Sequence, residues 1–195
     1  LGRKIMAKQI WKAGNMVYPV PAVMVSLMDK NGKANIITVA WTGTVCSDPP
    51  MAYISVRKER YSHPILVETG EFVINLTTEK LAKITDFCGV RSGRDVDKFK
   101  EMNLTRGKSS KIAAPLIQES PVNIECKVKQ VIELGSHDMF LAEVVAVQVD
   151  EKYMSSNGRF DLNAAGLMAY YHGEYLALGK KLGTFGYSVR KKNKK

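Results

Sequence analysis

Residues 35–57 contain the densest run of side chains that suit ligand binding. Two apolar, β-branched segments are joined here by small hydroxyl and thiol groups. Small polar side chains and closely approaching backbone amides suit the edge of a flat ligand with hydrogen-bond donors and acceptors, and Trp41 would supply an apolar wall. The alternative is an ordinary strand and turn in which threonine serves β propensity. The candidate ligands are Asn35, Thr38, Val39, Ala40, Trp41, Thr42, Thr44, Cys46 and Ser47.

Charged residues follow directly in the segment 57–63. Strand alternation puts Ser55 and Arg57 on one face, as expected for a ligand-facing pair. An arginine and a hydroxyl at a helix N-terminus form a ready anion site, so Arg57, Arg60 and Ser62 are predicted to hold the anionic end of a ligand, such as a phosphate, with Arg57 and Ser62 as the main ligands. Neighbours that would support them are Lys58, Tyr61 and His63. The alternative is a solvated, charged turn.

A third candidate segment spans residues 88–99, with the pattern C-G-x-x-S-G-x-D-x-D-K-F. Its two glycines permit close backbone approach to a ligand, and Lys98 would add positive charge near a phosphate. A helix C-terminus followed by a turn explains Gly89 equally well. Cys88 is predicted to be a small buried residue rather than a nucleophile.

Several strands must position these groups. Apolar runs with period-two alternation predict strands at 22–28, 35–40, 51–57, 71–76, 122–134 and 139–149, with one more short strand in 170–186. The Asn31-Gly32 pair predicts a hairpin between the first two. Helices are predicted at 61–68, 78–88 and 97–102, with Ser62 as an N-cap and Gly89 as a C-terminal stop. Segments 42–47, 109–120 and 153–163 are predicted loops.

This order of elements predicts a mainly β, antiparallel protein with helical additions, as a closed or partly closed barrel. The chain has 195 residues and 45% hydrophobic content, enough for one core, so residues 1–195 are expected to form a single domain. Its core would cover about residues 15–187, and residues 188–195 would form a basic C-terminal tail.

The net charge of +10 is concentrated near the ends of the sequence. Residues 1–12 and 180–195 contain 11 of the 29 basic residues and no acidic residue, so the remaining 18 bases nearly balance the 19 acids. Nucleic-acid binding is therefore disfavoured, because a basic face with interleaved aromatic residues is missing from the central part of the sequence. A solvated tail at 191–195 is the simpler interpretation.

Three widely spaced cysteines, Cys46, Cys88 and Cys126, predict neither a disulfide framework nor a zinc site, and no metal ligands are assigned. A reducing, cytoplasmic location is expected. No apolar run is long enough to span a membrane, and the first residues lack the apolar region of a signal peptide.

Five stretches together resemble the flavin reductase-like family: 35–57, 88–99, 115–121, 124–126 and 170–186. The resemblance spans roughly residues 15–187 and implies an FMN-binding split β-barrel with Greek-key topology. It implies FMN rather than FAD as the cofactor, bound by the residues named above. The tyrosines and glycines of 170–186 would close the cofactor pocket or form a dimer contact; the alternative is that they are ordinary core and turn residues. It also implies that His137, in the turn 135–138, contacts the nicotinamide or the flavin, whereas a histidine in a hairpin turn is otherwise usually solvated.

The resemblance implies hydride transfer from NADH or NADPH to the flavin, with NAD(P)H as a transient donor. Electrons would then pass to free flavin, ferric iron or a redox protein. It also implies a homodimer with FMN near the interface. The sequence contains no G-x-G-x-x-G pattern, so a Rossmann domain for the pyridine nucleotide is not predicted.

Two alternatives stay open. The first is an FMN electron carrier of the flavoredoxin type, which would not oxidise NAD(P)H directly and whose basic tail would meet acidic redox partners. The second keeps the barrel for another ligand or for nucleic acid, and would purify without colour.

Overall fold

Seven antiparallel strands form the body of the protein. The computed structural model describes residues 7–190. The strands are β1 (Val23–Met28), β2 (Ala34–Val39), β3 (Thr42–Ser47), β4 (Pro50–Arg57), β5 (Glu71–Asn75), β8 (Val122–Glu133) and β9 (His137–Val149), in the sheet order β2-β1-β5-β8-β9-β4-β3. The predicted mainly β, antiparallel fold with helical additions is confirmed, and the long β9 lies inside the sheet, as its apolar sequence indicated.

The sheet curls into a barrel because its two edge strands are consecutive in the chain. Only Ala40 and Trp41 separate β2 from β3, although these strands lie at opposite ends of the sheet order. The backbone amide of Ser55 donates a 2.8 Å hydrogen bond to the carbonyl of Trp41 and ties this link to β4. The connection from β4 to β5 passes two sheet positions, which gives the Greek-key topology.

The β1–β2 hairpin follows from its turn sequence. Gly32 has a φ of +79°, and the Asp29 carboxylate accepts hydrogen bonds from the amides of Asn31 and Lys33 at 2.9 Å. A glycine adopts this left-handed conformation without a steric penalty. The predicted hairpin is therefore confirmed.

Strands β1 and β2 bury both of their faces. One face points into the barrel, where Val25, Leu27 and Ile37 pack with Phe72 and Phe140. The other face carries Met24 and Ile36, which pack against side chains from the helices and from the segment after them. Two covered faces explain why these strands read as nearly continuous apolar runs.

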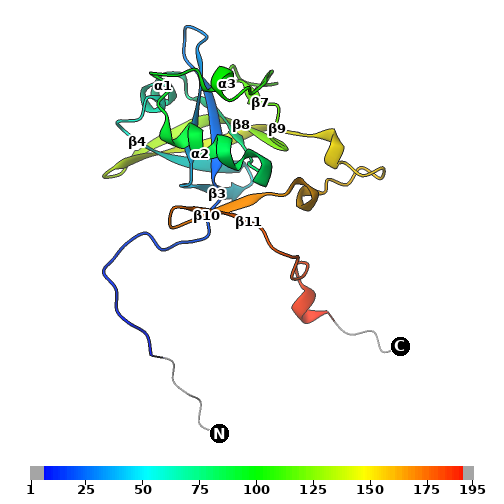
Figure 1. Cartoon of the computed structure of the whole chain (residues 1–195). Helices are drawn as coiled ribbons and strands as arrows, with labels where there is room; N and C mark the ends of the chain where they lie inside the picture. The colour runs from blue at the N-terminus through cyan, green and yellow to red at the C-terminus, as the bar shows by residue number, and fades with distance from the viewer. Residues whose placement is uncertain (1–6, 191–195) are drawn as a thin grey trace.

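Short helices and two small strand pairs surround the barrel (Figure 1). The helices α1 (Ser62–Thr69), α2 (Ala82–Val90) and α3 (Lys98–Glu101) gather on one side, and Ile65 and Leu66 of α1 join the barrel core. The small pairs are β6 (Arg106–Gly107) with β7 (Leu116–Ile117), and β10 (Met168–Tyr171) with β11 (Glu174–Ala177). Single 3-10 turns are η1 (Glu79–Leu81), η2 (Glu151–Tyr153), η3 (Leu162–Ala165) and η4 (Tyr187–Val189).

Several local predictions were wrong. The predicted loop 42–47 is strand β3, because it pairs with β4 along its length. Tyr61, not Ser62, is the residue before α1, and no side chain caps this helix. Gly89 lies within α2, which continues to Val90. One strand was predicted within 170–186, but this segment contains the end of β10 and all of β11, which form a hairpin. The predicted loop 109–120 contains strand β7, and the predicted loop 153–163 includes the end of η2 and the start of η3.

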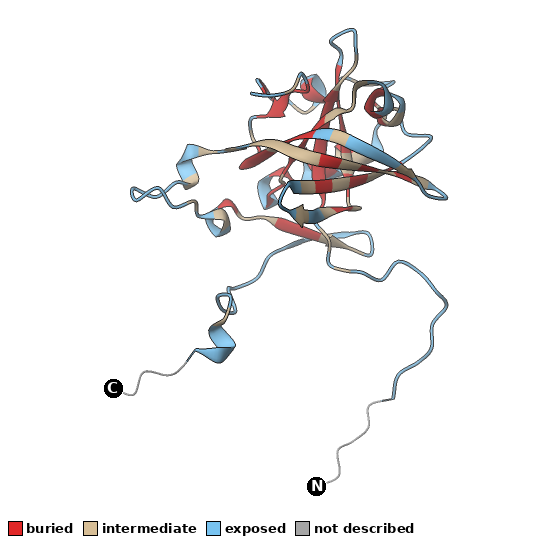
Figure 2. Ribbon diagram, turned by 180° about the vertical axis from the view of Figure 1, so that it is seen from behind, coloured by how far each residue is buried: buried red, intermediate tan, exposed pale blue. Residues whose placement is uncertain are grey.

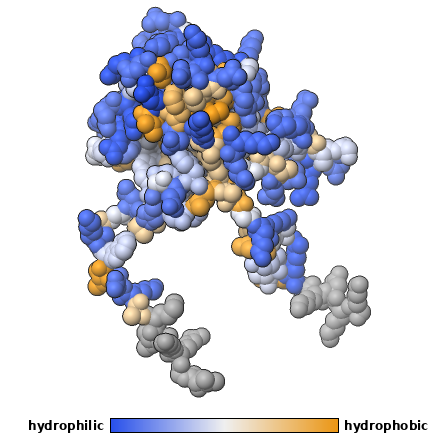
Figure 3. Space-filling view, viewed as in Figure 1, coloured by the Kyte–Doolittle hydropathy of each residue, from blue (hydrophilic) through white to orange (hydrophobic). Residues whose placement is uncertain are grey.

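Both ends of the described chain project from the barrel as extended arms (Figures 1 and 2). They carry apolar side chains in open solvent: Ile10, Trp11, Leu182 and Phe185 are all more than 70% exposed. Figure 3 shows apolar atoms on these arms and in the middle of one face of the body. The basic segment 191–195 lies outside the described residues, as do residues 1–6. No helix in the described part of the chain is long and apolar enough to cross a membrane.

Candidate functional site

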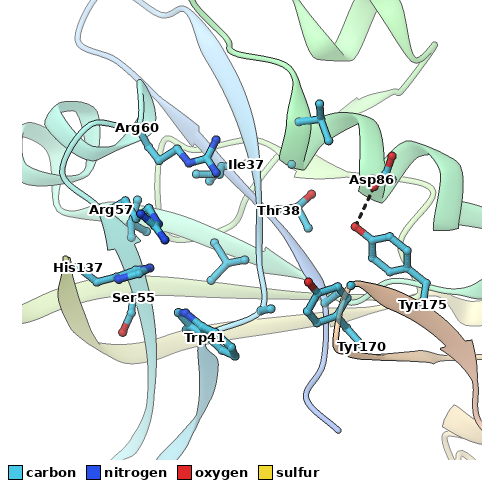
Figure 4. A pocket seen from close by; sticks show the side chains of 17 residues that line it. Ile37, Thr38, Trp41, Ser55, Arg57, Arg60, Asp86, His137, Tyr170 and Tyr175 are labelled. Atoms are coloured by element: carbon cyan, nitrogen blue, oxygen red, sulfur yellow. Dashed lines mark hydrogen bonds between the residues drawn. The ribbon is translucent and has the colours of Figure 1, made fainter. Parts of the chain in front are cut away.

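A cleft of about 360 Å³ opens where the ends of β2 and β4 meet helix α2 and the β10–β11 hairpin (Figure 4). The link between β2 and β3 brings Ala40 and Trp41 to its floor, and Ser55 and Arg57 come from β4. The alternation of β4 puts these two side chains on the face opposite the barrel core, as the sequence predicted. We call this cavity the ring cleft.

Aromatic side chains close one end of the ring cleft. Tyr170 and Tyr175 pack with ring centroids 5.4 Å apart, and the Tyr175 hydroxyl donates a 3.3 Å hydrogen bond to Asp86 of α2 (Figure 4). Burial, together with the Asp86 carboxylate, raises the pKa of Tyr175 to about 12. Its hydroxyl is therefore a permanent donor at neutral pH, and the bond ties the hairpin to α2.

Arg57 and His137 lie at the opposite end, as directly paired residues of β4 and β9. A 2.8 Å hydrogen bond joins His137 Nδ1 to the Ser136 hydroxyl, which leaves Nε2 as the ring nitrogen available to a ligand. Burial lowers the pKa of His137, and the Arg57 charge lowers it further. The imidazole is therefore neutral at pH 7.

A second cavity, of about 440 Å³, continues from the ring cleft and shares Ile37, Arg60 and Gly89 with it. Its lining includes four cationic side chains, Arg60, Arg91, Arg94 and Lys98, against a single carboxylate, Glu59. Such an excess of positive charge favours an anionic ligand. We call this cavity the cationic pocket, and the two cavities together the groove.

Lys98 is the buried cation of this pocket, with only 3% of its surface exposed. Its Nζ donates hydrogen bonds of 2.6 Å to the carbonyl oxygens of Ile36 and Cys88. An ammonium group has three donors, so one is left for a ligand. Burial lowers the pKa of Lys98 to about 8 and raises that of Cys88 to about 11, so this cysteine is an inert thiol.

Two glycines let α2 and the following turn approach strand β2. A Cβ atom on Gly93 would lie 2.0 Å from the side-chain oxygen of Asn35, and a Cβ on Gly89 would lie 3.2 Å from Thr38 Cβ. Asn35 in turn donates a 2.8 Å hydrogen bond to the hydroxyl of Ser62. The glycines of segment 88–99 thus serve close packing around the cationic pocket.

A family model, described as the flavin reductase like domain, matches residues 15–179. The chain belongs to the flavin reductase-like family. The flavoredoxin of Desulfovibrio vulgaris (Miyazaki F) is 31% identical, with a TM-score of 0.87 over 94% of this chain and 100% of that chain. The flavoredoxin of Methanosarcina acetivorans is 27% identical, with a TM-score of 0.84 over 93% and 97% of the two chains. An uncharacterised protein of Archaeoglobus fulgidus is 30% identical over 67% of this chain and 73% of that protein. The groove therefore lies in a flavin reductase-like split barrel.

The groove brings together most residues that the sequence singled out. The ring cleft contains Thr38, Val39, Ala40, Trp41, Ser55, Arg57, Gly89 and His137. The cationic pocket contains Asn35, Tyr61, Ser62, Cys88, Gly89 and Lys98. Arg57, Arg60 and Ser62 were predicted to hold the same anionic group, but Arg57 lines only the ring cleft and Ser62 only the cationic pocket. Arg60 lines both cavities and therefore lies at their boundary.

Five predicted ligands lie outside the groove. Thr42 is buried and its hydroxyl donates a 2.7 Å hydrogen bond to the carbonyl of Tyr53. Thr44, Cys46 and Ser47 pair along β3 with β4 instead of forming a loop, and so they run away from the cleft. The fifth is His63.

His63 instead braces loop 57–63 against strand β9. Its Nε2 lies 2.7 Å from Asp138 Oδ2, its ring packs edge-on against Phe140, and Lys58 Nζ lies 3.3 Å from Asp138 Oδ1. Burial alone would raise the pKa of Asp138, but the hydrogen bonds from His63 and Lys58 together lower it. The ionised carboxylate thus fastens loop 57–63 to strand β9.

Sequence reasoning missed several residues of the groove. Asp86 lies one helical turn before Gly89 and Val90 on α2, a spacing that puts all three on one face. Tyr170 and Tyr175 were not missed, because they belong to the stretch that was expected to close a cofactor pocket, and both line the ring cleft. The sequence did not reveal that they face each other across two strands, the β10–β11 hairpin. Arg91 and Arg94 flank Ser92 and Gly93 within the segment already noted. In the described part of the chain, no group of three or more His, Cys, Asp or Glu could hold a metal ion.

Proposed function

We propose that this protein binds FMN in the groove and oxidises NAD(P)H, passing the electrons to a second substrate. The observation that carries the proposal is the continuity of the two cavities. A cleft with aromatic, small-residue and hydroxyl walls opens into a pocket with a buried lysine and three arginines. FMN has the same division, with a planar ring system at one end and a phosphate at the other.

The residues fit such a ligand chemically. Backbone groups of segment 38–41 and the Ser55 hydroxyl would meet the polar edge of the ring system. Ser62, the free donor of Lys98, and Arg60 would hold the phosphate, which carries about −1.5 to −2 charge at pH 7. Charge-assisted hydrogen bonds of this kind are roughly twice as strong as neutral ones. The buried position of Lys98 favours a terminal phosphate, and hence FMN rather than FAD.

When bound, a flavin supplies the capacity to accept a hydride, which no side chain of the protein has. The protein's own residues bind, orient and shield it. The Tyr175–Asp86 bond holds the β10–β11 hairpin as one wall that limits water. Neutral His137 can donate or accept one hydrogen bond at the Arg57 end, and Arg57 supplies a nearby positive charge.

The test is the visible absorption spectrum of the purified full chain, titrated with FMN and then, without oxygen, with NADH and with NADPH. We expect a protein-perturbed flavin spectrum that bleaches with at least one donor, at a rate far above that of free FMN. Titrations with riboflavin and FAD are the matched controls, because riboflavin lacks the phosphate. Absence of FMN binding at micromolar protein would overturn the proposal.

A second candidate is an FMN electron carrier without direct NAD(P)H oxidation. The two flavoredoxins similar to this chain, at 31% and 27% identity, favour it. The same experiment separates the two functions: a carrier would bind FMN but bleach only when a separate reductase is added.

We also propose a homodimer in a reducing, cytoplasmic setting. Fully exposed Ile10 and Phe185 on the two arms are apolar surface that a second copy would cover. All three cysteines are free thiols, which suits a reducing compartment. Light scattering after size-exclusion chromatography should give about twice the chain mass of 21.7 kDa; a monomer at all concentrations would contradict the dimer.

A further inference from the structure

A third cavity, of about 460 Å³, lies directly beside the ring cleft. The two cavities share Ala40, Trp41, Ser55 and His137. Figure 4 labels the last three and shows their side chains along one side of the ring cleft. Its outer wall comes from the N-terminal segment 14–17 and from the β8–β9 turn. We call it the side pocket. A molecule in the side pocket would therefore lie next to whatever fills the ring cleft.

The side pocket contrasts with the cationic pocket in charge. None of the described residues that line it is Asp, Glu, Lys or Arg. Apolar surface comes from Met16, Val17, Val20 and Leu134, and the aromatic faces of Trp41 and Tyr53 lie among them. A charged molecule would lose hydration here without gaining a counter-charge, so the lining selects a neutral ligand.

The aromatic walls also favour a flat ligand. Trp41 packs against Tyr18, with ring centroids 6.1 Å apart, so its ring is held in place at the boundary. Planar rings gain stacking energy against such surfaces in addition to burial.

Two polar side chains of the side pocket lie at its boundary with the ring cleft, since they line both cavities. They are Ser55, whose hydroxyl is assigned to the ligand of the ring cleft, and His137, whose Nε2 stays available because Nδ1 is bonded to Ser136. With its pKa lowered by burial, the imidazole is neutral and can present N–H or a lone pair. A carbonyl oxygen at this boundary would accept a hydrogen bond from the Nε2–H of His137, on the side nearest the ring cleft.

We propose that the side pocket binds a neutral, planar carbonyl compound of the quinone class as the electron acceptor. This inference rests on the proposed function, because the reducing equivalents come from NAD(P)H. Overall, one NAD(P)H is oxidised to NAD(P)⁺, and the quinone takes up that hydride together with one proton to form the hydroquinone. Ferric chelates and free FMN are charged, and so they fit the side pocket poorly.

The test places a charge in the side pocket without touching the groove. Leu134 lines the side pocket and is 47% exposed, whereas Val131, near the end of β8, is 40% exposed and lies outside it. Leu134→Lys is therefore the test variant and Val131→Lys its matched control. Binding of duroquinone, a neutral quinone, and of anthraquinone-2-sulfonate, an anionic one, is measured by calorimetry on the full chain. Each titration is done with FMN-saturated and with flavin-free protein, in the absence of NAD(P)H.

We expect saturable one-to-one binding of duroquinone to the wild-type chain. Leu134→Lys should weaken duroquinone binding about tenfold and strengthen anthraquinone-2-sulfonate binding by a similar factor, because the new charge offers a counter-ion. Val131→Lys should change neither. FMN affinity, measured separately, should be unchanged in both variants, since neither residue lines the groove. With NAD(P)H, the KM for duroquinone should rise in Leu134→Lys alone.

Equal effects of the two lysine variants, or no saturable duroquinone binding to FMN-saturated wild type, would overturn the side-pocket proposal while leaving FMN binding intact. Duroquinone binding without its reduction by an FMN-loaded protein that bleaches with NAD(P)H would overturn the acceptor role. Failure of the proposed function is recognised separately, by absence of FMN binding or of bleaching.

Discussion

Lys98 Nζ donates a 2.6 Å hydrogen bond to the carbonyl oxygen of Cys88. This bond joins α3 to the C-terminal part of α2, and the equivalent bond to Ile36 joins α3 to β2. One lysine thus connects the three elements around the cationic pocket and still has a donor for a ligand. Its pKa of about 8, lowered by burial, makes this function sensitive to mildly alkaline pH.

FMN affinity should decrease as pH rises above about 8. In the ligand-free protein Lys98 loses its proton there, so FMN binding must be accompanied by proton uptake. The dissociation constant should then rise by up to about tenfold per pH unit. Flavin fluorescence titrations between pH 7 and pH 9.5 measure this.

Riboflavin and Lys98→Met are the controls for this pH dependence. Riboflavin has no phosphate, so its affinity should stay flat over the same range, and Lys98→Met should bind FMN more weakly with no pH dependence. The ligand-free wild type should also gain stability between about pH 8 and pH 9, because its unfolded state, with a lysine pKa near 10.5, binds more protons than the folded state. Above pH 9 the buried thiols of Cys88 and Cys126, whose pKa values are raised, oppose this gain. A flat FMN profile in the wild type would exclude Lys98 as a phosphate ligand.

Arg60→Ala should lower FMN affinity more than Arg57→Ala does. Arg60 borders the cationic pocket, whereas Arg57 lines only the ring cleft and lies 3.5 Å from the Glu59 carboxylate. Loss of one charge-assisted hydrogen bond to a phosphate costs about 1.5–3 kcal/mol, or about 10- to 150-fold in affinity. Parallel FMN and riboflavin titrations of both variants measure the difference. If Arg60→Ala lowered the affinity for riboflavin as much as the affinity for FMN, Arg60 would not act on the phosphate.

Gly93→Ala should destabilise the fold by about 1–3 kcal/mol, as expected for overpacking. The new Cβ would meet the Asn35 side chain at 2.0 Å and displace its bond to Ser62. Gly179→Ala is the matched control, because nothing lies within 4 Å of a Cβ there. Urea unfolding curves measure both variants. Equal stability of the two would mean that the turn at Gly93 moves aside freely.

In the native protein, a thiol reagent such as Ellman's reagent should modify Cys46 quickly and the other two cysteines slowly. Cys88 and Cys126 are fully buried, and burial raises their pKa values to about 11 and about 12. Thiolate is the reactive form, so both cysteines react slowly for two reasons: the reagent cannot reach them, and little thiolate is present. The reaction should give one fast equivalent per native chain and three in urea. Cys46→Ser should remove the fast phase and retain flavin binding, since Cys46 lies outside the groove.

The sequence by itself determined the local elements. The Asn31-Gly32 turn, the apolar runs of β1, β2 and β9, and the alternation of Ser55 and Arg57 predicted real features, because turn conformation and strand periodicity depend on neighbouring residues. It also supplied most residues of the groove, since they come from two continuous segments, 35–62 and 88–98.

Only the tertiary structure decided which residues share a cavity. The sequence of segment 42–47 predicts a polar loop, but pairing with β4 makes it a strand. The sequence also does not distinguish Arg57 from Arg60, although in the structure only Arg60 lines the cationic pocket. The side pocket joins residues 14–17 to Trp41 and Leu134 across more than a hundred residues of sequence. Such cavities arise from barrel closure and strand register, which are set by long-range packing and leave no periodic signal in the chain.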